Sequence, residues 1–219
     1  MNNKTQVIGQ IREIGIVPVI RAASAGEARQ LIEAILAGGI SIFEVTMTIP
    51  SAVLLIESLV ADFGDKAIIG AGTVLDAETA QNCLAAGAKF VVSPTLNLSV
   101  IEICRRENVA VFPGALTPTE IVAAWQAGAD AVKIFPANSV GGANYLKAIK
   151  APLPQIELMP TGGVTLDKIG DFIRAGAIAV GVGSDLADVQ AIRTGESEKV
   201  TKTARAFVKA VSETRLSGV

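Results

Sequence analysis

The chain has no histidine among its 219 residues. This absence excludes Ser-His-Asp and Cys-His catalytic triads, and it removes the side chain that most often binds transition metals. Proton transfer must therefore fall to glutamate, aspartate, lysine, tyrosine or water.

The sequence also lacks a long hydrophobic run. Half of its residues are hydrophobic and the mean hydropathy is +0.49, yet glycine, proline or charged residues interrupt every stretch of the roughly 18 residues that a membrane span requires. The first residues, MNNKTQVIGQIREIG, include charged side chains and no apolar segment of the kind that directs export. We therefore expect a large buried core, no membrane partner and a cytoplasmic location.

Neither charge nor cysteine content indicates a special partner. The formal net charge is −2, and no block of lysine and arginine interleaves with aromatic residues, so we do not expect nucleic acid as a partner. The two cysteines, Cys83 and Cys104, each lie in an apolar helical stretch. In a cytoplasmic protein this is typical of buried free thiols, and we assign them no chemistry.

Eight short hydrophobic runs recur along the chain, and a stretch of helical periodicity follows each one. The runs are IVPVIR, ISIFEVT, AIIGAGT, KFVVSP, VAVFPG, AVKIFP, IELMPTGG and IAVGVGS. Their continuous hydrophobicity is typical of parallel strands buried on both faces. The helical stretches end in the signals AGGI, AGAK, AGAD and AGAI, in which a glycine can take the left-handed conformation.

Eight strand–helix units predict an α/β fold of the closed (β/α)8 type, a TIM barrel. A short N-terminal helix over about residues 3–13 would cap the bottom of this barrel. A doubly wound nucleotide-binding sheet is disfavoured, because the segment after the first strand reads RAASAGEA and contains no GxGxxG. No linker divides the chain, so we expect residues 1–219 to form a single domain.

Lys133 lies in the strand candidate AVKIF, between apolar neighbours. Strand alternation places it on the face opposite Val132 and Ile134, which predicts that its side chain points into the barrel. Burial disfavours the charged ammonium, and a neutral amine is the nucleophile that attacks a carbonyl carbon. A structural lysine paired with a buried carboxylate would explain the strand context equally well.

Glu44 stands near the end of the strand candidate ISIFEVT, on the same face as Ile42 and Thr46. If Ile42 faces inward, Glu44 does too. An amine and a carboxylate that converge in a barrel mouth suit imine chemistry, in which one group attacks and the other transfers protons. An unreactive buried ion pair would use the same two residues.

Further candidates follow the ends of other strands, where the active sites of barrels lie. Arg21 and Thr73, after the first and third strands, could together hold the carboxylate of an oxo acid, although each could also be a helix cap or a salt-bridge partner. The turns after the last two strands predict a phosphate site, because glycine lets an anion approach backbone amides. These turns contain Thr161, Gly162, Gly163 and Ser184.

In order and in content, these motifs resemble one bacterial family, the 2-keto-3-deoxy-6-phosphogluconate (KDPG) aldolases. The family includes relatives that act on 4-hydroxy-2-oxoglutarate (KHG) and on 2-keto-3-deoxy-6-phosphogalactonate. The resemblance covers nearly the whole chain and implies a class I aldolase that uses no metal or other cofactor and assembles as a homotrimer. It rests on VPVIR at 17–21, FEVTMTIP at 43–50, IGAGTVL at 69–75, FVVSP at 90–94, FPGALTPTE at 112–120, VKIFPA at 132–137, PTGGV at 160–164 and GVGSDL at 181–186.

The resemblance also implies roles for single residues. Lys133 matches the Schiff-base lysine, Glu44 the acid–base glutamate, and Thr73 the threonine that binds the pyruvyl carboxylate. Some members carry a carboxylate-binding arginine where this chain has Thr48, and members without it have an arginine at the position of Arg21. The resemblance therefore assigns the carboxylate contact to Arg21. The remaining matches are Phe135 beside the imine, Pro94 in the pocket lining, and Gly162, Gly163 and Ser184 at the phosphate end.

The expected reaction is the reversible cleavage of KDPG to pyruvate and glyceraldehyde 3-phosphate, with KHG cleavage to pyruvate and glyoxylate as a second activity. The phosphogalactonate analogue remains an alternative substrate, because the choice at C4 depends on small displacements of side chains. Two other functions remain open from the sequence. One is a phosphosugar isomerase or epimerase on the same barrel, and the other is a sugar-phosphate or oxo-acid binding protein without turnover.

Overall fold

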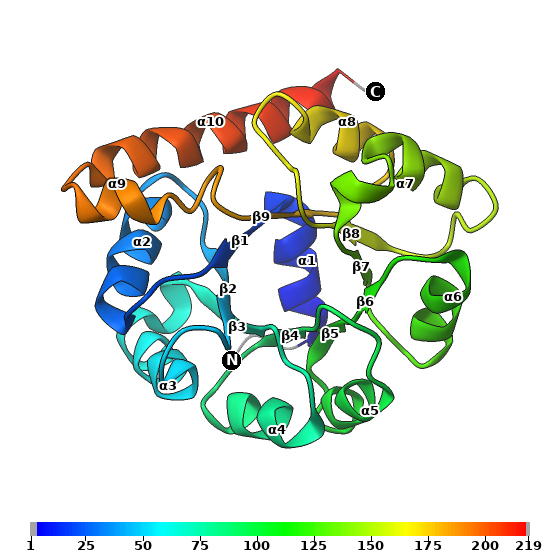
Figure 1. Cartoon of the computed structure of the whole chain (residues 1–219), viewed down its shortest axis with the longest axis horizontal. Helices are drawn as coiled ribbons and strands as arrows, with labels where there is room; N and C mark the ends of the chain where they lie inside the picture. The colour runs from blue at the N-terminus through cyan, green and yellow to red at the C-terminus, as the bar shows by residue number, and fades with distance from the viewer. Residues whose placement is uncertain (1–3, 218–219) are drawn as a thin grey trace.

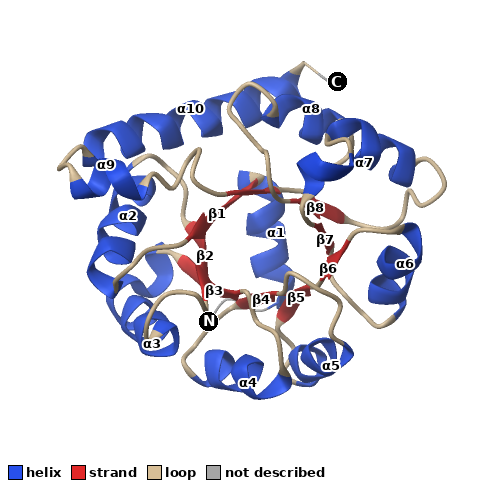
Figure 2. Cartoon of the chain, viewed as in Figure 1, coloured by secondary structure: helices blue, strands red, loops and turns tan. Residues whose placement is uncertain are grey.

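The computed structural model describes residues 4–217 and shows an α/β fold with the strands inside and the helices around them (Figures 1 and 2). The strands are β1 (Ile16–Ile20), β2 (Ile42–Thr46), β3 (Ile68–Gly72), β4 (Phe90–Val92), β5 (Ala110–Phe112), β6 (Gly114–Ala115), β7 (Val132–Ile134), β8 (Leu158–Pro160) and β9 (Val180–Val182). The helices are α1 (Lys4–Ile14), α2 (Ala25–Ala37), α3 (Ala52–Phe63), α4 (Ala77–Ala85), α5 (Leu98–Arg106), α6 (Pro118–Gln126), α7 (Ala143–Lys150), α8 (Ile169–Arg174), α9 (Val189–Arg193) and α10 (Ser197–Leu216), with 3₁₀ turns η1 (Gly64–Lys66) and η2 (Ala137–Val140). Within this described part of the chain, no helix has the length and apolar character needed to cross a membrane.

The strands form two parallel sheets. The larger has the order β5-β4-β3-β2-β1-β9 and the smaller the order β6-β7-β8, and every paired strand runs parallel to its neighbour. Isolated parallel bridges join Leu158 to Ala177 and Thr161 to Gly181, so the chain around β8 also meets the chain around β9. The predicted parallel α/β character is confirmed, and the carboxyl ends of these strands carry the candidate site.

The fifth predicted strand, VAVFPG, is divided in the structure. β5 ends at Phe112 and belongs to the larger sheet, whereas β6 begins at Gly114 and belongs to the smaller one. Pro113 lies between them and has no amide hydrogen to donate to a ladder. Its carbonyl oxygen accepts a hydrogen bond from the backbone N–H of Lys133 at 2.8 Å. The chain therefore passes from one sheet to the other at this proline.

The predicted glycine signals do end four of the helices. The glycines that follow α2, α4, α6 and α8 have φ values of 98°, 95°, 101° and 93°, a conformation in which a side chain is strained. These are Gly39, Gly87, Gly128 and Gly176. In the AGGI signal the preceding Gly38 serves packing instead, because a Cβ there would lie 2.4 Å from the Cβ of Ala204 on α10.

Buried hydrophobic side chains form two clusters. The larger one, which includes Val132, fills the space between the strands and the helices. The smaller one contains inward-facing strand residues such as Ile42, together with Val7 and Ile11 of α1. The N-terminal helix therefore covers this inner cluster, as the sequence predicted. Asn3, the first residue of the predicted helix, lies outside the described residues.

Both cysteines are buried and free, as predicted. Burial raises the pKa of the Cys83 thiol to about 11 and that of the Cys104 thiol to about 12. Both thiols are therefore protonated at neutral pH, where they behave as small hydrophobic groups of the core.

Candidate active site

Lys133 on β7 and Glu44 on β2 meet in the interior of the molecule. Lys133 Nζ lies 3.4 Å from Glu44 Oε1, and only 3% and 0% of the two side chains are exposed. Removing two charges from water is costly unless each compensates the other. Among the ion pairs between described residues, this is the only one in which both side chains are buried.

Side-chain alternation along β2 and β7 accounts for this meeting. Ile42 and Ala131 belong to the inner cluster, and Glu44 and Lys133 lie two residues further along the same strand faces. Val132 packs on the opposite side, in the larger cluster. Both inward orientations predicted from the sequence are therefore confirmed, and the two side chains share one space.

Gly72, the last residue of β3, leaves the room that the Glu44 carboxylate occupies. A Cβ at this position would lie 2.2 Å from Glu44 Oε1, well inside van der Waals contact. The other carboxylate oxygen, Oε2, is buried and has no hydrogen-bond partner among the described residues. Because a buried acceptor without a partner costs free energy, Oε2 is an acceptor that a ligand's hydroxyl group can satisfy.

Phe135 follows β7 and holds its ring beside the lysine. The ring centroid lies 5.4 Å from Lys133 Nζ, a distance at which a cation and an aromatic face attract each other. Phe135 is half-buried and also lines a neighbouring cavity. It therefore connects the Lys133–Glu44 pair to a space that is open to solvent.

This cavity, with a volume of about 170 Å³, lies at the carboxyl ends of β1, β8 and β9. Its walls include the glycine turns that follow the last two strands and the residue that follows β1. Gly162 and Gly163 have φ values of 96° and 71°, which residues with a side chain rarely adopt. The cavity gathers six of the predicted site residues: Arg21, Phe135, Thr161, Gly162, Gly163 and Ser184.

Thr161 adds a buried hydroxyl group to the same cavity. Only 4% of this residue is exposed, and its Oγ1 has no hydrogen-bond partner among the described residues. Gly181 on β9 makes room for it, because a Cβ at Gly181 would lie 2.2 Å from Thr161 Oγ1. A polar ligand in the cavity can therefore use this hydroxyl group.

Thr73 and Pro94 lie at the carboxyl ends of β3 and β4, away from the walls of this cavity. Thr73 has a φ of 59°, which is uncommon for any residue except glycine. The Pro94 carbonyl packs against Gly114, which pairs with Lys133 in the sheet. Arg21 thus shares a cavity with the glycine turns and not with Thr73. That Arg21 and Thr73 together bind one carboxylate stays a prediction.

Sequence reasoning missed two glycines that shape the site and one buried hydroxyl group at the end of a neighbouring strand. Gly72 and Gly181 give space to Glu44 and Thr161, and Ser93 at the end of β4 is 1% exposed with no partner for its Oγ among the described residues. Each is a small residue at or near a strand end, which is the only signal that the sequence offers. Which side chain each of these residues faces depends on how neighbouring strands pair, and the sequence of one strand does not specify that pairing.

The chemical groups of the site are a buried amine, a carboxylate and an adjoining cavity with backbone amides. Across residues 4–217, no group of three or more cysteine, aspartate or glutamate side chains is arranged to hold a metal ion. A buried lysine beside a carboxylate, at the strand ends of a parallel α/β fold, is typical of enzymes that form an imine with a carbonyl substrate.

Comparison with known proteins narrows this class. The family model for KDPG and KHG aldolase matches residues 7–203. The chain belongs to this aldolase family.

Its relatives cover both phosphorylated substrates considered above. The 2-dehydro-3-deoxy-phosphogluconate aldolase of Haemophilus influenzae is 34% identical over 93% of this chain and 95% of its own. The 2-dehydro-3-deoxy-6-phosphogalactonate aldolase of Escherichia coli is 36% identical over 92% and 96%. A crystal structure of the KDPG aldolase of Legionella pneumophila, with pyruvate captured as a covalent carbinolamine, is 31% identical over 93% and 98% of the two chains and superimposes with a TM-score of 0.86.

Proposed function

We propose that this aldolase reversibly cleaves KDPG to pyruvate and glyceraldehyde 3-phosphate through a Schiff base on Lys133. Cleavage of KHG to pyruvate and glyoxylate is a second activity of the same site. The observation that carries the proposal is the buried contact of 3.4 Å between Lys133 Nζ and Glu44 Oε1. This contact places a nucleophile beside a group that can transfer protons, the two groups that imine chemistry needs. The membership of the chain in an aldolase family favours this interpretation over a purely structural lysine.

In the cleavage direction, neutral Lys133 adds to the C2 carbonyl carbon of the substrate, and loss of water gives a protonated imine. Glu44 transfers the protons of these steps. It then takes the proton of the C4 hydroxyl group, the C3–C4 bond breaks, and its electron pair moves into the imine to form an enamine. The aldehyde leaves, Glu44 returns a proton to C3, and hydrolysis frees pyruvate and regenerates Lys133.

The other predicted residues bind the two ends of the substrate in this proposal. Phe135 lies beside the imine, while Thr73 and Pro94 line the pyruvyl end. Thr161, Gly162, Gly163 and Ser184 bind the phosphate, which is supported by their common cavity. The sequence assigned Arg21 to the carboxylate of the substrate. Its place in the same cavity as the glycine turns instead supports a contact with the phosphorylated end.

The proposal extends to the architecture. We propose that the two sheets together form one closed (β/α)8 barrel and that residues 1–219 fold as a single domain, which the bridges from β8 toward β9 support. The homotrimer and the cytoplasmic location expected from the sequence belong to the same proposal. Light scattering of the purified protein tests the trimer, since a mass near 22.5 kDa would instead indicate a monomer.

Borohydride trapping with pyruvate, followed by peptide mass mapping, tests the Schiff base. We expect one pyruvyl adduct, located on Lys133. The Lys133→Met variant should give no adduct and lose cleavage by about 10³-fold or more, whereas Lys147→Met, which changes an exposed lysine on α7, should retain both. A folded protein without an adduct would overturn the Schiff-base assignment and favour an isomerase or a binding protein.

The phosphogalactonate substrate remains a second candidate, because the relative from Escherichia coli acts on it by name and is as similar as the phosphogluconate relatives. The ratio of kcat/KM for the two C4 epimers decides between them. A ratio above one in favour of KDPG supports the first proposal, and the reverse ratio supports the second.

A further inference from the structure

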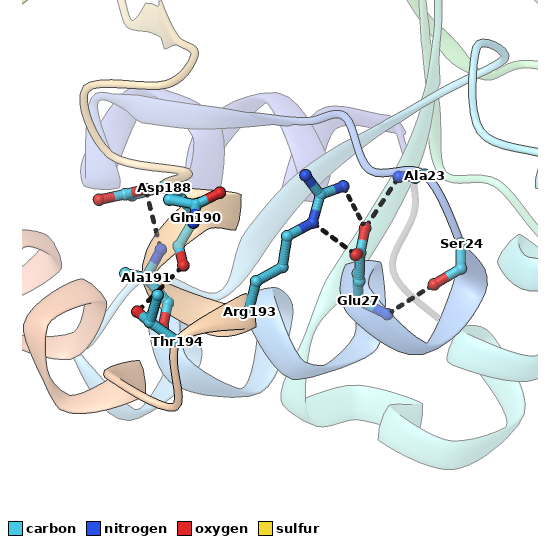
Figure 3. Close-up of polar contacts among 8 residues, drawn as sticks. All are labelled: Ala23, Ser24, Glu27, Asp188, Gln190, Ala191, Arg193 and Thr194. Atoms are coloured by element: carbon cyan, nitrogen blue, oxygen red, sulfur yellow. Dashed lines mark hydrogen bonds and ion pairs between the residues drawn. The ribbon is translucent and has the colours of Figure 1, made fainter.

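An ion pair links the beginning of α2 to the end of α9 (Figure 3). Arg193 donates from Nε to Glu27 Oε1 at 2.7 Å and from Nη2 to Glu27 Oε2 at 3.1 Å. This two-contact geometry fixes the orientation of both groups and is the strongest arrangement of an arginine and a carboxylate. The pair joins segments that are 166 residues apart in the chain.

The same carboxylate also holds the turn between β1 and α2. Glu27 Oε2 accepts a hydrogen bond from the backbone N–H of Ala23 at 3.0 Å, and Ser24 Oγ accepts one from the backbone N–H of Glu27 at 3.2 Å. The Arg193 side chain and the Ala23 amide lower the pKa of Glu27. Glu27 is therefore ionised at neutral pH, as the ion pair requires.

On the other side, α9 is a short helix that is closed at both ends (Figure 3). Asp188 Oδ1 accepts from the backbone N–H of Ala191 at 3.1 Å, and the Thr194 hydroxyl group donates to the Gln190 carbonyl oxygen at 3.1 Å. These contacts fix the backbone that carries Arg193. Arg193 therefore extends from a fixed backbone, and its contact with Glu27 restricts the movement of the turn between β1 and α2.

The two linked segments are continuous with two walls of the cavity. Arg21, two residues before Ala23, lines one wall, and Ser184, a few residues before α9, lines another. The exposed Arg21 side chain makes no hydrogen bond or ion pair with any residue between 4 and 217. The backbone of Arg21 lies between the end of β1 and the turn that Glu27 holds.

We propose that Glu27 and Arg193 are positioning residues that hold Arg21 opposite the Ser184 turn, at the spacing that the phosphate group of the substrate needs. This inference rests on the proposed aldolase function and adds a determinant of its preference for phosphorylated substrates. Neither residue touches the reacting atoms, so their loss should change binding of the phosphorylated end and leave the chemistry at Lys133 intact.

The test compares KDPG with unphosphorylated 2-keto-3-deoxygluconate in Arg193→Met, Glu27→Gln and the double variant. We expect KM for KDPG to rise roughly two- to fivefold, as for the loss of a well-oriented surface pair, with kcat and the yield of pyruvyl adduct unchanged. KM for the unphosphorylated substrate should not change. Arg193→Lys keeps the positive charge but cannot make both contacts with Glu27, so its KM for KDPG should lie between those of the wild type and Arg193→Met.

Arg174→Met is the matched control, because Arg174 forms an exposed ion pair with Asp171 at 2.7 Å on α8 and should leave both KM values unchanged. Equal KM changes for the two substrates would overturn the inference, and so would a double variant whose KM for KDPG rises by the product of the two single increases. In either case, turnover by the wild-type protein would still support the proposed function. A wild-type protein that forms no pyruvyl adduct and does not cleave KDPG would overturn both.

Discussion

At the scale of single residues, the site depends on a glycine, because residue 72 has no Cβ. The Glu44 carboxylate occupies the place that a Cβ of residue 72 would take, 2.2 Å from Oε1. The contact with Lys133 Nζ therefore exists only because β3 ends in glycine. The same relation holds between Gly181 and Thr161, so two small residues set the positions of two polar groups.

We expect Gly72→Ala to displace the Glu44 carboxylate and to lower kcat for aldol cleavage by about 10²-fold, which is typical for loss of a positioned proton-transfer group. The added methyl group should also cost about 1–3 kcal/mol of folding free energy through overpacking. Steady-state kinetics and urea unfolding separate these effects. Gly9→Ala is the control, because a Cβ at Gly9 meets no atom within 4 Å, and native kcat in folded Gly72→Ala would contradict the prediction.

At the scale of single elements, α6 has the most complete helix cap in the described chain. Thr117 Oγ1 accepts from the backbone N–H of Glu120 at 3.3 Å, and Glu120 Oε2 accepts from the backbone N–H groups of Thr117 and Leu116 at 2.8 and 2.9 Å. This capping box satisfies amides that a helix start leaves unpaired. The hydrogen bonds from Thr117 and Leu116 lower the pKa of Glu120.

A lowered pKa in the folded state gives a pH-dependent contribution to stability. The contribution is present above the unfolded pKa of about 4.3 and is lost as the pH falls through the folded value. Glu120→Gln should therefore lower the free energy of unfolding at pH 7 by about 0.5 kcal/mol, and the difference should close below about pH 4. Urea unfolding at both pH values measures this, with the exposed Glu102→Gln on α5 as control. A difference that persists at low pH would exclude the ionised cap as its cause.

Local patterns predicted the elements and the inward faces of β2 and β7, because alternation and apolar neighbours are properties of single strands. Ile42 and Ala131 facing inward were enough to bring Glu44 and Lys133 together. The division of the fifth strand at Pro113 depended on which sheet each half joins, and the Glu27–Arg193 pair depended on how α2 and α9 pack. Those relations arise from the three-dimensional arrangement, which single-sequence patterns do not specify.

At the scale of the whole molecule, the two ends of the described chain hold each other in place. Arg215, in the last turn of α10, donates to the carbonyl oxygens of Arg12, at 2.7 Å, and Glu13 in α1. The last carbonyl groups of a helix have no partner within the helix, and a positive charge there is favourable. Because α1 covers the inner cluster, Arg215 also helps to keep that cluster closed.

We expect Arg215→Met to lower the free energy of unfolding by about 1–2 kcal/mol, since two carbonyl groups lose their charged partner. Burial lowers the pKa of Arg215, but a guanidinium group stays charged throughout the range in which proteins fold, so the loss should be the same at about pH 6 and 8. Arg205→Met provides the control, because Arg205 makes one long contact of 3.5 Å with the Ala37 carbonyl from the same helix. Urea unfolding and hydrogen exchange of the α1 amides report the result. Exchange should accelerate in α1 with Arg215→Met alone. Unchanged exchange in Arg215→Met would show that the apolar contacts of Val7 and Ile11 hold α1 instead.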